Sequence, residues 1–127
     1  MEPLISIVLD QNQRRYSPGE LLTCEYQVDA IEADEIQAVE ASVMWHTEGK
    51  GDEDFSVHWF ERRLPHNGEA DLRPLHRIKT RLPNSPLSYD GQIVKVRWQV
   101  RVRVFLRGGK DFHSDKAFEL GHVDGFQ

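Results

Sequence analysis

The stretch that decides the fold runs from Leu82 to Leu106 and reads LPNSPLSYDGQIVKVRWQVRVRVFL. From Val94 onward every second residue is apolar, and Lys95, Arg97, Gln99, Arg101 and Arg103 stand between them. This alternation has the period of a β-strand with one buried and one solvent-facing side, and its β-branched valines favour the same structure. We therefore predict a long strand over Val94–Leu106, with Trp98 on its buried side.

Shorter stretches on both sides show strand patterns and are separated by proline- and glycine-containing turns. The predicted strands are Leu4–Leu9, Leu22–Ala30, Gln37–Thr47, Phe55–Arg63, His76–Arg81 and Asp111–Leu120. The acidic connection Ile31–Glu35 allows one turn of helix at most. This pattern predicts an all-β fold, a single immunoglobulin-like antiparallel β-sandwich over residues 1–127.

Composition limits the classes of function. The formal net charge is -5, from 16 basic and 21 acidic residues, which argues against general nucleic-acid binding. The single cysteine, Cys24, excludes an intramolecular disulfide, and we predict that it is buried and unreactive. The N-terminal apolar run ends at Asp10, too short for a signal peptide or a membrane span, so we expect a cytoplasmic protein.

Two motifs resemble the N-terminal half of the arrestin superfamily. The first is Tyr16-Ser17-Pro18-Gly19-Glu20 with the strand that follows it, similar to the family's aromatic-x-Pro-Gly-Glu turn. The second is Leu82-Pro83 with Pro86-Leu87-Ser88-Tyr89-Asp90-Gly91 and the strand through Trp98, similar to the family's LP and P-S-aromatic-x-G loop. The resemblance implies an arrestin-like sandwich and work as a protein–protein adaptor or scaffold.

The chain also departs from that family. Arrestins carry two sandwiches in tandem, and this chain has the length of one. It shows no proline-tyrosine ligase-binding motif and no clathrin-box-like tail, so receptor binding and phosphate sensing do not transfer from the resemblance. Fold alone is a weak guide to function.

A basic strip is the candidate partner-binding site. Lys95, Arg97, Arg101 and Arg103 alternate with the apolar residues of the long strand and so share its outer face. They form a groove for an acidic peptide, phosphate or anionic lipid in one interpretation. In the other, acidic residues of the next strand neutralise them. If Arg107 lies opposite Asp111, then Arg103 faces Asp115 and Trp98 faces Leu120, an arrangement that favours neutralisation.

A second hairpin joins Gln37–Thr47 to Phe55–Arg63. We predict that Trp45 lies opposite Trp59 and that Phe55, Val57 and Trp59 point to the same apolar side. This register makes His46 and His58 outer-face neighbours, and it places Met44 and Phe60 on that face too. The sequence leaves open whether the face is exposed, as an apolar docking patch, or covered.

No catalytic constellation is evident. His113-Ser114-Asp115 has the residue types of a catalytic triad, but on a strand Ser114 points away from the other two. Two histidines without further ligands do not make a structural zinc site. We expect a non-enzymatic protein without cofactor or metal, a binding or adaptor module with a protein partner. The alternative is a structural sandwich that forms homo-oligomers through an exposed edge.

Overall fold

Strand β8 (Val94–Leu106) is the central strand of the structure. The structure, a computed structural model, describes residues 2–49, 53–66, 70–121 and 123–124. One edge of β8 pairs with β4 (Ile36–Gly49) from Val94 to Leu106. The other edge is shared, because β7 (Tyr89–Asp90) pairs with its beginning and β9 (Asp111–Leu120) with the rest.

The seven predicted strands are confirmed. Besides β4, β8 and β9, these are β1 (Leu4–Leu9), β3 (Leu21–Asp29), β5 (Phe55–Arg63) and β6 (His76–Arg81). The acidic connection forms the predicted single turn, a 3-10 helix over Ala33–Glu35. Three two-residue strands were not predicted, namely β2 (Arg15–Tyr16), β7 and β10 (Val123–Asp124).

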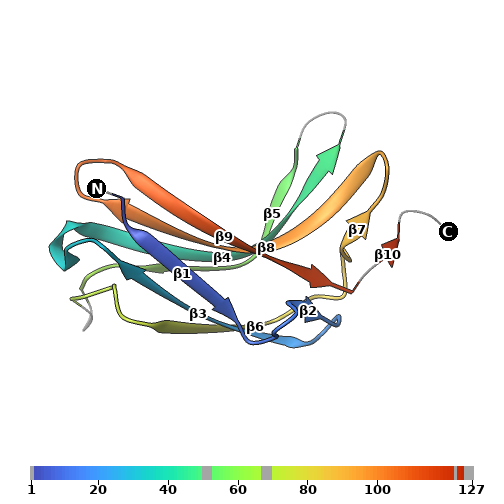
Figure 1. The fold of residues 1–127 in the computed structure, drawn as a ribbon, viewed down its shortest axis with the longest axis horizontal. Helices are drawn as coiled ribbons and strands as arrows, with labels where there is room; N and C mark the ends of the chain where they lie inside the picture. Colours follow the sequence, from blue (N-terminus) through green and yellow to red (C-terminus); the bar gives the residue numbers. More distant parts are fainter. Residues whose placement is uncertain (1, 50–52, 67–69, 122, 125–127) are drawn as a thin grey trace.

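The strands form the predicted sandwich of two sheets. The smaller sheet has the order β1-β3-β6, and the larger has the order β10-β7-β8-β4-β5 with β9 on the shared edge of β8. Figure 1 shows the sheets stacked on the left, while the β4–β5 hairpin and the beginning of β8 extend beyond the smaller sheet on the right. Strand β5 pairs with β4 alone among the described residues, and so lies at a sheet edge.

The two quoted motifs lie together. The Gly19 amide donates to the Leu82 carbonyl oxygen over 3.1 Å, and the Leu82 amide donates to the Glu20 carbonyl oxygen over 2.9 Å. Gly19 has φ of +81°, the left-handed region that glycine adopts without strain. The indole Nε1 of Trp98 donates to the Pro86 carbonyl oxygen over 2.8 Å. The turn and the loop therefore close one end of the sandwich over the core.

The core contains the apolar sides of both sheets. Trp98, Val100, Val102 and Val104 of β8 are buried, as the alternation predicts. Cys24 on β3 is also buried, which confirms its predicted place, and burial raises its pKa to about 12, with the charges of Asp10 and Glu25 adding to the effect.

The predicted register of β8 with β9 is wrong by two residues. Trp98 lies opposite Phe118 rather than Leu120, and Arg103 opposite His113 rather than Asp115. The hairpin closes one residue earlier on each strand because the 3-10 helix before β4 holds Arg107, whose amide donates to the Glu35 carbonyl oxygen over 2.9 Å. A shift of two residues leaves every side chain on its predicted face.

The predicted register of β4 with β5 is also wrong. Val43 lies opposite Trp59, Met44 opposite Val57 and Trp45 opposite Ser56, so His58 is an extra residue in β5. Such a β-bulge reverses the facing of the residues on one side of it. Trp59 therefore packs inward, whereas Phe55 and Val57 lie on the outer face.

Candidate functional site

The outer face of the larger sheet carries all four predicted site residues. Arg101 and Arg103 form its best-defined ion pairs. Arg101 contacts Asp115 through two hydrogen bonds, from Nε over 2.7 Å and from Nη2 over 3.1 Å, and these bonds raise the pKa of Arg101. Arg103 Nε donates to Asp111 Oδ1 over 3.0 Å. A bidentate guanidinium–carboxylate pair fixes a side chain more firmly than a single contact does.

The other two cations are held more loosely. Lys95 Nζ lies 3.5 Å from Asp90 Oδ1, and Arg97 Nη2 lies 3.7 Å from the same oxygen. Arg97 has a second acidic neighbour, since its Nε lies 3.8 Å from Glu48 Oε2. These separations exceed hydrogen-bond lengths, and all the side chains involved are partly exposed, so each pair contributes little to stability. Lys95 and Arg97 are thus the cations of the strip that the carboxylates of this chain hold least tightly.

His46 links the strip to the centre of the face. Its Nδ1 lies 2.7 Å from Gln99 Oε1 and its Nε2 lies 3.0 Å from Glu48 Oε1. The hydrogen bond with His46 is the main cause that lowers the pKa of Glu48, and Arg97 adds to it. Gln99 is 5% exposed, so the His46 ring satisfies a buried amide oxygen.

An apolar patch lies beside this network on the edge strand. The β5 patch is defined here as Phe55, Val57 and Phe60, whose exposed fractions are 52%, 54% and 51%. Phe55 stacks on His46 at 5.4 Å between ring centroids, and the Arg101 guanidinium is 6.0 Å from the Phe55 ring. Exposed apolar residues that gather on one edge strand indicate an interaction surface more strongly than exposed apolar residues scattered singly.

The structure separates His46 from His58, which the sequence placed together. His46 lies on the outer face, whereas His58 packs edge-on against buried Trp98 and its Nε2 lies 2.9 Å from the Arg81 carbonyl oxygen. The bulge at His58 explains this separation. Met44 and Phe60 share the outer face as predicted, with Met44 buried at 6% exposure and Phe60 exposed. The described residues contain no group of three or more His, Cys, Asp or Glu side chains that could hold a metal ion.

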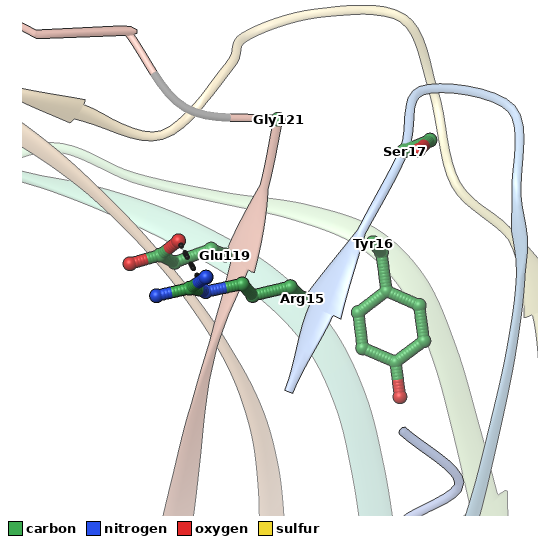
Figure 2. A pocket seen from close by; sticks show the side chains of 5 residues that line it. All are labelled: Arg15, Tyr16, Ser17, Glu119 and Gly121. Atoms are coloured by element: carbon green, nitrogen blue, oxygen red, sulfur yellow. Dashed lines mark ion pairs between the residues drawn. The ribbon is translucent and has the colours of Figure 1, made fainter. Parts of the chain in front are cut away.

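A separate pocket of about 310 Å³ lies between β2 and β9. Figure 2 shows Arg15 paired with Glu119 on one side of β2, while Tyr16 points to the other side. Arg15 Nε is 3.5 Å from Glu119 Oε2, and both side chains are exposed. Tyr16 is buried, and its hydroxyl donates to Asp10 Oδ1 over 2.7 Å. Burial is the main cause that raises the pKa of Tyr16, and the hydrogen bond with Asp10 raises it further. The tyrosine therefore serves the core, and the charged groups that line the pocket are the exposed Arg15 and Glu119, which pair with each other.

Comparison with known proteins places the fold. A scan against protein-family models and a search of curated proteins gave no match. A solved structure, the sporulation control protein Spo0M of Bacillus subtilis, is similar to this chain with a TM-score of 0.66 and 16% sequence identity. The similarity covers 93% of this chain and 49% of that one, so the chain spans about half of its neighbour's length. The chain has an arrestin-like all-β fold.

Sequence reasoning found the cations of the outer face but placed Phe55 and Val57 on the wrong side. The signal for the bulge was present, because Trp59 and Phe60 are adjacent large aromatics in a strand that otherwise alternates. A second signal was Val43-Met44-Trp45 in the partner strand. Adjacent apolar residues indicate either a two-sided core or a local change of facing.

Proposed function

We propose that this protein is a non-enzymatic regulatory or adaptor module that binds a protein partner through the β5 patch. The observation that carries the proposal is the alignment of Phe55, Val57 and Phe60 on the outer face of an edge strand, each about half exposed. Two large aromatic side chains among three supply the anchors typical of protein interfaces. The similarity to a sporulation control protein supports a regulatory role.

The basic strip forms the rim of the proposed interface. Arg101 and Arg103 are committed to carboxylates of β9, whereas the looser pairs of Lys95 and Arg97 can exchange a neighbour for an acidic group on a partner. Rim charges chiefly set association rate and selectivity, while the buried anchors set affinity. The proposal includes a cytoplasmic location and a single sandwich over residues 1–127. Among the described residues there is no helix long and apolar enough to cross a membrane.

Affinity capture with matched baits tests the proposal. Val57→Lys places a charge in the patch, and Val8→Lys makes the same change on β1, where Val8 is 64% exposed at the edge of the other sheet. We expect at least one protein to be retained about tenfold better by wild type and Val8→Lys than by Val57→Lys. An identical set of proteins on all three baits would contradict the proposed surface.

The same partner then provides a second measurement. Amide hydrogen exchange in its presence should slow in the peptide covering residues 55–63 and stay unchanged in the peptide covering residues 4–9. Slower exchange confined to another element would move the binding surface away from the β5 patch.

A further inference from the structure

Along β5, the order of outer-facing and inner-facing residues reads the same from either end. Phe55 and Val57 lie on the outer face before the bulge, and Phe60 and Arg62 lie on the same face after it. The midpoint of these four positions falls between His58 and Trp59. An unbulged strand would put Val57 and Phe60 on opposite faces, so the bulge itself creates this symmetry.

The two ends of β5 carry opposite charges. Glu53 and Asp54 precede β5, and Arg62 and Arg63 end it. An antiparallel copy of the strand brings each acidic end beside a basic end, whereas a parallel copy brings like charges together. Opposite charges across a strand pair are favourable and like charges are unfavourable.

We propose that the partner of the β5 edge is a second copy of this chain, paired antiparallel with β5 about a two-fold axis between His58 and Trp59. This inference rests on the proposed function and names the occupant of the same edge. Val57 lies opposite Phe60 of the second copy, and Phe55 lies opposite Arg62 of the second copy. Each contact occurs twice, as a two-fold interface requires.

The chemistry of these pairs is complementary. Val57 with Phe60 is an aromatic and β-branched pair, a combination that stabilises adjacent strands. Arg62 already lies 5.5 Å from the Phe105 ring and pairs with Glu40, so its guanidinium is preoriented on the outer face when Phe55 of the second copy arrives. The larger sheets of the two copies then become continuous through their β5 edges.

The interface predicts a modest affinity. One strand pair with four outer side chains from each copy buries less than the roughly 1,600 Å² of a standard interface. We therefore expect a dissociation constant on the order of 1–100 µM, with monomer and dimer in exchange.

Sedimentation velocity on the purified chain tests the dimer directly. Between about 1 µM and 500 µM the wild type and Val8→Lys should shift from monomer to dimer, and Val57→Lys should weaken the dimer by about tenfold or more. A wild type that stays monomeric throughout, or equal dimerisation of Val57→Lys and wild type, would overturn the inference. Partner capture uses separate baits, so a monomeric wild type with capture lost only in Val57→Lys would leave the proposed function standing without the dimer.

Cysteine crosslinking tests the register. Directly opposite residues in antiparallel strands have Cα atoms about 4.5–5.5 Å apart, within the span of a disulfide. A mixture of Val57→Cys and Phe60→Cys chains should form a disulfide-linked dimer under mild oxidation, and Val57→Cys alone should form about tenfold less. Cys24 is buried and does not compete. Equal crosslinking by Val57→Cys alone would refute this register.

Discussion

Replacing Trp98 by phenylalanine is the sharpest test of how the core is closed. Trp98 is 1% exposed, it packs against Phe118 at 5.8 Å between ring centroids, and its indole donates to the Pro86 carbonyl oxygen. Phenylalanine fits the same position but has no donor and a smaller ring. The substitution therefore removes one hydrogen bond and leaves a small space, without adding any polar group to the core.

The magnitude follows from those two losses. Loss of the hydrogen bond to the partly buried Pro86 carbonyl costs about 0.5–1.5 kcal/mol. The smaller ring adds about 1–2 kcal/mol for the incompletely filled space. We expect Trp98→Phe to lower the free energy of unfolding by about 1.5–3.5 kcal/mol, a large part of the roughly 5–15 kcal/mol of a typical domain.

Urea unfolding followed by far-ultraviolet circular dichroism measures this change. The midpoint should fall while the m-value stays constant, because the native surface is unchanged. Trp59→Phe is the matched control, since Trp59 is only partly buried on the edge strand, and it should cost less than about 1.5 kcal/mol. Equal costs for the two variants, within about 0.5 kcal/mol, would refute the assigned role of the Trp98–Pro86 bond.

Three further predictions concern the other contacts. Cys24, whose pKa is raised to about 12, should resist iodoacetamide at pH 8 until the chain is unfolded, and fast labelling of the native protein would contradict this. The free energy of unfolding should also decrease above about pH 9, because there the thiol ionises in the unfolded chain but not in the folded one. Arg101→Lys, which loses the two-pronged contact with Asp115, should lower the free energy of thermal unfolding by about 0.3–1 kcal/mol. An unchanged Tm would contradict a stabilising role for this pair. The pKa of Glu48 is lowered in the folded state, so the contribution of Glu48 to the free energy of unfolding is present above its unfolded pKa and lost as the pH falls through its folded pKa. Glu48→Gln should therefore flatten the loss of stability below about pH 5. The same acid dependence of stability in wild type and variant would contradict the role of His46.

The backbone pattern of β8 was predictable because a single signal dominates it. Seven apolar residues occupy every second position from Val94 to Leu106, with polar ones between them as far as Arg103, and the structure buries that row from Trp98 to Leu106. His76–Arg81 is a weaker case, and Pro74 just before it was enough to exclude a long helix and leave a short strand. Element type and approximate bounds follow from such local information.

Register did not follow from local information. The β8–β9 turn is tied to the 3-10 helix before β4 through Arg107 and Glu35, residues far apart in the sequence, and this contact moves the pairing by two residues. Faces survive a shift of two, so the basic strip was placed on the correct face. Arg101 rather than Arg103 contacts Asp115, and Arg103 contacts Asp111 instead.

The bulge at His58 had the larger consequence. One extra residue moved Phe55 and Val57 from the predicted inner side to the outer face, and it separated His58 from His46. The candidate site thus consists of residues that alternation places on the outer face, namely the basic strip and Phe60, and of Phe55 and Val57, whose facing only the folded pairing of β4 with β5 reveals.

The central claim is that β5 is the binding edge and that a second copy of the chain occupies it. Amide hydrogen exchange measured at several protein concentrations tests this claim most directly. Between about 5 µM and 500 µM, exchange in the peptide covering residues 55–63 should slow several-fold, because the edge of β5 that faces away from β4 gains hydrogen-bond partners from the second copy. The peptide covering residues 4–9 at the β1 edge should exchange at the same rate throughout. Exchange in residues 55–63 that does not depend on concentration would contradict the account.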